Sequence, residues 1–203
     1  MSDNKLIKIG NFLGDMFILQ AYFICYSLRG GIILGVFPSF MAVIDILSIK
    51  FYKEDDEVLS YLFKKSYKEN FKKSNQVGWV LLLSGALLIF DYYINKNYIN
   101  NKAVGLILLI LLIIYIILAS HVPITLLRFD LSFKNYFKQA MLIALSSPFE
   151  LISVILSELL IEQVLVRLPI LILFLGAPLV AMPFAWFTYR SVEKIKEKKQ
   201  KES

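Results

Sequence analysis

Long stretches without any charged side chain constrain this chain more than any other feature. Residues 103–127 and 168–189 contain no Asp, Glu, Lys or Arg, and residues 139–149 form a shorter stretch of the same kind. A helix needs about 20 apolar residues to cross the roughly 30 Å of hydrocarbon in a bilayer. The two longer stretches meet that length without help. They therefore predict α-helices that cross a membrane.

The composition agrees with a membrane protein. Hydrophobic residues make up 58% of the 203 residues and charged residues 19%, whereas an average soluble protein is about 45–50% apolar. A soluble fold of this size could not bury so much apolar surface. Residues 76–94 and 139–160 add two further spans if their few acidic residues are tolerated. We expect one integral membrane domain over residues 1–203.

The basic residues indicate an orientation. Sixteen of the 22 lie in three blocks, at residues 50–73, 128–138 and 190–201. Basic loops stay on the cytoplasmic side of a membrane, so the blocks predict a multi-pass protein of the cell membrane with a charged cytoplasmic tail at 191–203. That tail either binds acidic lipid headgroups or only anchors the orientation.

The first apolar segment, residues 16–49, is too long for one straight helix across a bilayer. Glycines and a proline between residues 30 and 38 predict a break near its middle. We interpret the segment as one broken crossing that follows a polar N-terminal segment, residues 1–15, on the outer side. The total is then about five transmembrane helices. A two-pass hairpin with the N-terminus inside is the alternative.

Two segments that combine aromatic residues with lysines resemble each other. Residues 66–74 and 132–140 share Ser, an aromatic residue, Lys and then Phe-Lys at matching positions. Rings spaced by four residues share one helical face: Phe63, Tyr67 and Phe71 in the first segment, and Phe129, Phe133 and Phe137 in the second. We expect two amphipathic cytoplasmic segments that either lie in the membrane interface or dock on a partner protein. A nucleic-acid partner is not expected beside membrane spans.

Polar residues inside apolar segments are candidate functional groups, because a charge in hydrocarbon is costly. Glu150 stands near the middle of the span expected at 139–160, and Arg29 is the best candidate to pair with it. The pair would form either a substrate or proton-linked site or a structural contact between helices. Asp45 lies nearer the end of its segment. His121, the one histidine, is expected to serve packing or a kink with Pro123.

Motifs for catalysis are absent from the sequence. It contains no glycine-rich phosphate loop ending in Lys-Ser or Lys-Thr, no His-Glu-x-x-His and no Gly-x-Ser-x-Gly. With one histidine and one cysteine, most nucleophilic and metal chemistries lack their parts. We therefore expect no enzyme activity, no metal and no cofactor.

Three segments resemble the YesL-like family of bacterial membrane proteins. The stretch Gly35-Val36-Phe37-Pro38-Ser39-Phe40-Met41-Ala42 is similar to a Gly-x-Phe-Pro-Ala-x-x-Ala stretch of that family, with Ser39 in place of the expected Ala. Residues 63–75 look like its first cytoplasmic segment, and residues 128–140 look like its second. The likeness extends over about residues 10–190.

The resemblance implies a role without assigning any site residue. YesL-like proteins are mostly from Gram-positive bacteria, have no established function and often accompany ABC importers of oligosaccharides. It thus implies a non-catalytic accessory or subunit that meets an ABC permease or ATPase. An independent small-solute transporter that uses Glu150 and Arg29 is the alternative, and a structural or regulatory membrane protein is a third.

Overall fold

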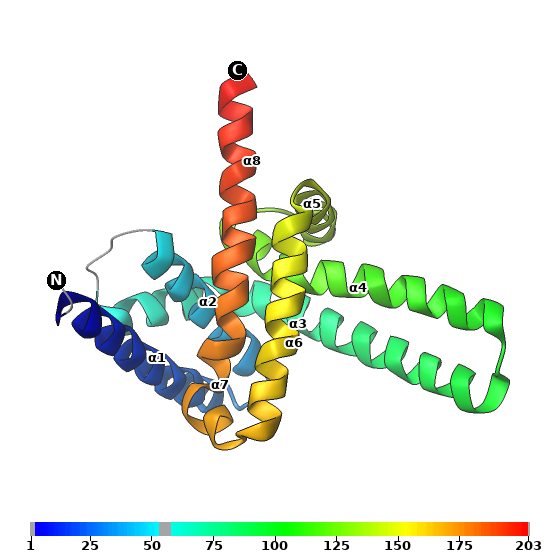
Figure 1. The fold of residues 1–203 in the computed structure, drawn as a ribbon, viewed down its shortest axis with the longest axis horizontal. Coiled ribbons are helices and arrows are strands. Elements are labelled where there is room, and N and C mark those ends of the chain that lie inside the picture. Colours follow the sequence, from blue (N-terminus) through cyan, green and yellow to red (C-terminus); the bar gives the residue numbers. More distant parts are fainter. Residues whose placement is uncertain (1–2, 53–57, 203) are drawn as a thin grey trace.

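The computed structural model describes residues 3–52 and 58–202, and these residues are helical almost throughout (Figure 1). The elements are α1 (Asp3–Arg29), α2 (Val36–Tyr52), α3 (Leu59–Ile94), η1 (Asn95–Ile99), α4 (Lys102–Arg128), α5 (Phe133–Ser146), α6 (Pro148–Arg167), α7 (Ile170–Pro183), η2 (Phe184–Thr188) and α8 (Tyr189–Glu202), with η1 and η2 being π-helical turns. No strand occurs in these two ranges, which confirms the all-α prediction. Lys53 of the first basic block lies outside them.

Three continuous helical stretches are long and apolar enough to cross a membrane. They are Leu59–Ile99, Lys102–Arg128 and Ile170–Ile195, and α5 with α6 would make a fourth if this bent pair is one span. A polytopic membrane protein is therefore confirmed. The count of five is not, because within the described residues neither α1 nor α2 qualifies alone.

The first apolar segment folds back on itself instead of forming one broken crossing. The chain reverses at Gly31 (φ 70°) and Ile32 (φ 62°), and Ile32 N–H donates to the Ser27 carbonyl at 2.8 Å. Helices α1 and α2 then run antiparallel, with an ion pair between Asp15 and Lys50. The prediction of a single crossing is wrong, and the hairpin alternative describes the geometry. Both ends of the hairpin therefore lie on the same side. An N-terminus on the outer side was expected only because a single crossing would have separated it from the basic block at 50–73, and that reason no longer holds.

Close backbone contacts explain the Gly-x-Phe-Pro stretch. A Cβ on Gly35 would lie 2.2 Å from the Ser27 carbonyl oxygen, so only glycine allows the turn to close this tightly. Gly78 of α3 leaves room for the Phe37 ring, which a Cβ there would meet at 2.3 Å. This stretch therefore joins the α1–α2 hairpin to α3.

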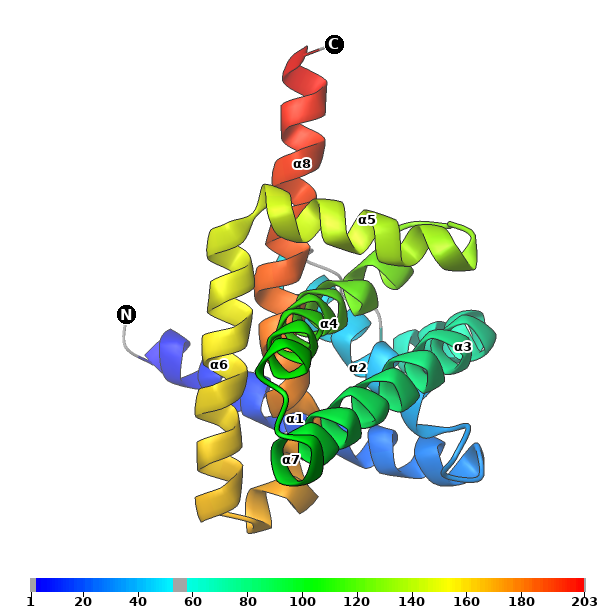
Figure 2. The same ribbon diagram turned by 90° about the vertical axis from the view of Figure 1, so that its right-hand side faces the viewer.

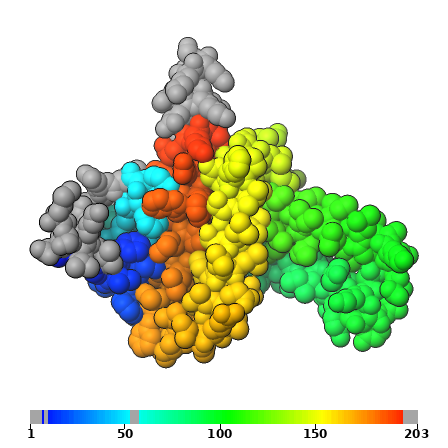
Figure 3. Space-filling model, in the orientation of Figure 1, coloured from blue at the N-terminus to red at the C-terminus, as the bar shows by residue number. Residues whose placement is uncertain are grey.

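Two helical hairpins, α3–α4 and α6–α7, run in different directions (Figures 1 and 2). The later part of α3 and the first part of α4 form an arm that stands clear of the other elements, whereas α6, α7 and α8 run in another direction (Figures 1 and 2). The space-filling view shows the same green arm projecting from the blue, orange and yellow body (Figure 3). The arm contacts the body mainly at its base, near the start of α3 and the end of α4.

The segment 139–160 is broken rather than straight. Ser147 has φ −138° and ψ 63°, which is not helical, and the following Pro148 disfavours a helical conformation at this position. The axes of α5 and α6 differ by 100° across this break. Glu150 consequently lies in the first turn of α6 and not in the middle of a helix.

Candidate functional site: a polar junction between the helices

Three of the four polar residues singled out in the sequence converge on one junction. Asp45 comes from α2, His121 from α4 and Glu150 from α6. They meet basic and aromatic side chains near the end of α4 and the start of α8. We call this set the polar junction; its members are Asp45, Tyr52, His121, Arg128, Glu150, Tyr189, Arg190 and Lys194.

Glu150 is the acidic centre of the α6–α8 contact. Only 6% of the residue is exposed, and its carboxylate accepts a hydrogen bond from the Lys194 ammonium. Arg190, one turn earlier on α8, lies 4.0 Å from the same oxygen. The position in the first turn of α6 also suits a negative charge, because the free N–H groups there carry partial positive charge. The pair ties the start of α6 to α8.

Arg128 is the basic centre of the α2–α4 contact. Its Nη2 lies 3.3 Å from Asp45 Oδ1, and its guanidinium stacks over the Tyr189 ring at 4.6 Å. Tyr189 in turn stacks on Tyr52, with ring centroids 4.4 Å apart. A partly buried ion pair of this kind adds little net stability but holds its partners in one arrangement. Three chain regions are thus fixed to one another.

His121 is fully buried beside this network. Its Nδ1 lies 2.9 Å from the Ser120 hydroxyl, and its carbonyl accepts a hydrogen bond from Thr125 at 2.8 Å. Nε2 has no hydrogen-bond partner among the described residues. These contacts agree with a packing role close to Pro123, which interrupts the α4 hydrogen-bond ladder.

Arg29 does not join the polar junction. It ends α1, is exposed and has its guanidinium 6.0 Å from the Tyr26 ring. The predicted pair of Arg29 with Glu150 is therefore wrong, since Lys194 and Arg190 occupy that role. An alternative solute site built from Glu150 and Arg29 loses its geometric basis.

The aromatic-lysine segments are packed more deeply than expected. Phe63 and Tyr67 are buried in the core against α1 and α2, and Phe71 packs at its edge. The first segment is the opening part of the long helix α3. Because its rings pack inside the protein, they are not available as a surface for a partner. In the second segment Phe129 and Phe137 pack against buried clusters, and only Phe133 is exposed.

Gln20 is a structural polar residue that the sequence did not single out. This buried amide of α1 accepts a hydrogen bond from Ala177 N–H at 2.9 Å and donates one to the Ile172 carbonyl at 3.2 Å. Both partners are backbone groups of α7 near Pro178, where a proline removes one donor from the helix. The sequence signal that could have identified it is a single glutamine within an apolar stretch.

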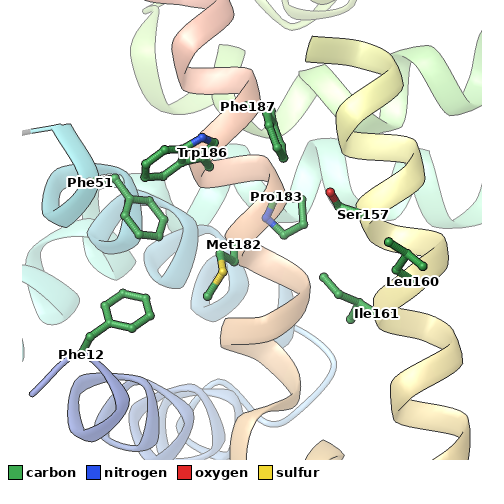
Figure 4. A pocket seen from close by; sticks show the side chains of 9 residues that line it. All are labelled: Phe12, Phe51, Ser157, Leu160, Ile161, Met182, Pro183, Trp186 and Phe187. Atoms are coloured by element: carbon green, nitrogen blue, oxygen red, sulfur yellow. The ribbon is translucent and has the colours of Figure 1, made fainter. Parts of the chain in front are cut away.

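An apolar groove adjoins the polar junction. It has a volume of about 540 Å³ and lies on the face where α7 and η2 are flanked by α1–α2 and by α6 (Figure 4). Phe12 and Phe51 line one wall, Leu160 and Ile161 line the other, and Trp186 lies on its floor. We call it the α7 groove.

Comparisons with known proteins agree with the resemblance noted in the sequence. A family model described as "Protein of unknown function, DUF624" matches residues 16–92. A relative in Bacillus subtilis (strain 168), described as "Uncharacterized protein YesV", is 26% identical over 180 residues, which are 87% of this chain and 86% of that protein. The resemblance to the YesL-like family is confirmed. No solved structure matches this chain.

The family match covers the hairpin and most of the arm's first helix. Residues 16–92 include nearly all of the α1–α2 hairpin, the turn at Gly35 and α3 almost to its end. They include Asp45 and Tyr52 of the polar junction, whereas its other members lie beyond the match. The matched region therefore defines a scaffold rather than a complete site.

Proposed function

We propose that this chain is a non-catalytic accessory subunit of an ABC-type importer of oligosaccharides in a bacterial cell membrane. The resemblance to the YesL-like family is the reason for naming such a system. The partner would be the permease, reached through the membrane, with the basic ends of the helices and the C-terminal tail in the cytoplasm.

The observation that carries the proposal is the uncovered surface of the α3–α4 arm. Only 6% of the residues in the most apolar window of α4 are buried, although its mean hydropathy is 3.1. Successive helical residues point about 100° apart, so exposed side chains at neighbouring positions cover nearly the whole circumference. These include Leu106, Ile107, Leu109, Ile110 and Leu111.

Such an arm suits association within the bilayer. Lipid can cover it, and transmembrane helices of a partner can pack on it through van der Waals contacts. The charges of the polar junction, by contrast, are largely engaged with one another, which favours a scaffold over a solute site. A protein that presents a broad apolar arm from a fixed junction has the form expected of an accessory subunit.

The three basic blocks support a cytoplasmic position for the junction end. Lys73 of the first block contacts Asp130 within the second at 2.5 Å. Arg128 of the second lies on Tyr189, which immediately precedes Arg190 of the third. The blocks therefore meet at one end, as the positive-inside rule requires of a single side.

Site-specific photo-crosslinking in native membranes tests the proposal. A benzophenone side chain would replace Leu83 or Leu106 on the arm, or the control Leu156, an equally exposed apolar residue on α6. Cells would be grown on oligosaccharides, and crosslinked partners identified by mass spectrometry after purification in mild detergent.

We expect an ABC permease to crosslink to both arm positions and not to Leu156. Crosslinks to lipid alone at all three positions, with the protein purifying by itself, would contradict the accessory role. Equal crosslinking of the permease at Leu156 would move the interface away from the arm.

A further inference from the structure

The α7 groove and the polar junction together have the layout of a binding site for one membrane lipid. We propose that they bind an anionic phospholipid, with an acyl chain in the α7 groove and the phosphate at Arg190 and Lys194. This inference does not depend on the accessory role proposed above.

The groove provides a surface for an acyl chain. Its walls and floor are almost entirely apolar, and it opens on the outer face of Ile170–Ile195, one of the candidate membrane spans. Its volume of about 540 Å³ lies within the range of about 300–1,000 Å³ common for small-molecule sites. A bilayer supplies only one abundant kind of molecule with a flexible apolar chain at that position.

A row of aromatic rings leads from the groove to the basic pocket. The Trp186 ring lies 4.9 Å from Phe51 and 5.8 Å from Tyr52, and Tyr52 stacks on Tyr189. Tryptophan and tyrosine concentrate at the boundary between hydrocarbon and headgroups. The row thus places that boundary between the apolar groove and the charged pocket, in the order of tail, glycerol and phosphate.

The pocket above this row carries exposed cations. It has a volume of about 420 Å³ and is lined by Tyr52, Tyr189, Arg190, Glu193 and Lys194. The side chains of Arg190 and Lys194 are 56% and 46% exposed and both lie within 4.0 Å of the Glu150 carboxylate. Glu193 also lines the pocket, so the phosphate would be held by the exposed N–H groups of Arg190 and Lys194 and not by an excess of positive charge. Basic pockets between helices on the cytoplasmic side of membrane proteins bind anionic headgroups.

Quenching of tryptophan fluorescence by lipids with brominated chains tests the site. The chain has two tryptophans, so Trp79→Phe leaves Trp186 on the groove floor as the reporter. The full-length protein in detergent would be titrated with brominated phosphatidylglycerol or brominated phosphatidylcholine. We expect saturable quenching by both lipids, with half-quenching by phosphatidylglycerol at a mole fraction about tenfold lower than by phosphatidylcholine. A tenfold difference in affinity is what one charge-assisted hydrogen bond contributes.

Two variants separate the parts of the site. Arg190→Gln should raise the half-quenching mole fraction of phosphatidylglycerol about tenfold, whereas Arg167→Gln at the opposite end of α6 should not change it. Ser157→Phe adds a ring from the groove wall and should abolish the saturable phase. Its control, Leu156→Phe, changes an exposed neighbour outside the groove.

Quenching that rises linearly with the bulk mole fraction, alike for both headgroups and unaffected by Arg190→Gln and Ser157→Phe, would indicate only the surrounding lipid annulus and would overturn the proposal. Circular dichroism and gel filtration of each variant would verify that its helices and size are retained.

Discussion

Ile32 has a backbone conformation that its side chain opposes. Its φ of 62° lies in the left-handed region, where a β-branched residue is a rare outlier. The preceding Gly31 has a similar φ and no Cβ to clash. Ile32 keeps this conformation because its N–H bonds the Ser27 carbonyl and so closes the turn between α1 and α2. Its exposed side chain gives no packing in return.

Replacing Ile32 by glycine should therefore stabilise the protein. We expect Ile32→Gly to raise the free energy of unfolding by about 1 kcal/mol, since the left-handed conformation costs an L-residue about 1–2 kcal/mol while glycine adds some unfolded-state entropy. Thermal unfolding in detergent measures the change.

Ile33 provides the matched control for this prediction. It is the next residue and equally exposed, but it is not among the described residues with positive φ. Ile33→Gly should lower stability slightly or leave it unchanged. A loss of stability in Ile32→Gly comparable to that in Ile33→Gly would show that the turn is not strained.

Sequence reasoning identified polar residues better than it identified their partners. Asp45, His121 and Glu150 stood out because a polar group in an apolar run is costly, and the structure brings them together. Their partners Arg128, Arg190 and Lys194 belong to basic blocks, where composition accounts for them as orientation signals. Arg29 was assigned to Glu150 because both lay in apolar segments, and that criterion contains no information about distance.

The break between α5 and α6 determines what Glu150 can contact. Pro148 begins α6 and turns it 100° from α5, so the first turn of α6 faces the start of α8. A straight helix over residues 139–160 would have carried Glu150 into the lipid. The contact between two elements thus depends on a proline two residues before the carboxylate.

Removing Lys194 should cost more than removing the charge of Glu150. Lys194→Gln leaves a buried carboxylate with Arg190 at 4.0 Å as its remaining basic partner, and we expect a loss of about 1–3 kcal/mol. Glu150→Gln leaves a half-exposed lysine that water can solvate, so its loss should be smaller. Unfolding in detergent of both single variants and the double variant should give a coupling of about 1 kcal/mol.

Arg29→Gln is the control for this cycle. Because Arg29 is exposed and away from Glu150, its substitution should change stability by no more than about 0.5 kcal/mol and should be additive with Glu150→Gln. Coupling between Arg29 and Glu150 equal to that with Lys194 would require a different arrangement of α1.

At the level of elements, the apolar periodicity predicted helices but not their directions. The glycine-rich break at 30–38 was correctly placed, whereas the reversal there arises from two left-handed residues and a close contact at Gly35. The rings of Phe63 and Tyr67 have the spacing of an interfacial helix. They are buried because the hairpin packs on them, a contact between distant parts of the chain that no local pattern contains.

For the whole molecule, the charge distribution was the most informative feature. The three basic blocks are distant in sequence yet meet through Asp45, Arg128, Tyr189 and the Lys73–Asp130 pair. The connections with few charges, after α3 and after α6, lie at the far ends of the two hairpins (Figure 1). The divergence of these hairpins could not be predicted, since lipid-facing helices carry no pattern that specifies their crossing angle.

The orientation can be tested with cysteine labelling in intact cells. Cys25→Ser removes the one native cysteine, and single cysteines would then be placed at Asn97, Lys134 and Gly10, all exposed. Asn97 lies at the tip of the arm, so a membrane-impermeant maleimide should label it from outside. Lys134 in the second basic block should react only after permeabilisation.

Gly10 distinguishes the hairpin from a separate crossing of α1. Phe12, two residues later, packs on Phe51 with ring centroids 5.8 Å apart, so the start of α1 lies beside the end of α2 and Lys50 of the first basic block. The cysteine at Gly10 should therefore behave like the one at Lys134 and stay protected in intact cells. Labelling at Gly10 from outside, with Lys134 still protected, would mean that residues 16–49 form one crossing in the membrane and that the α1–α2 hairpin opens there.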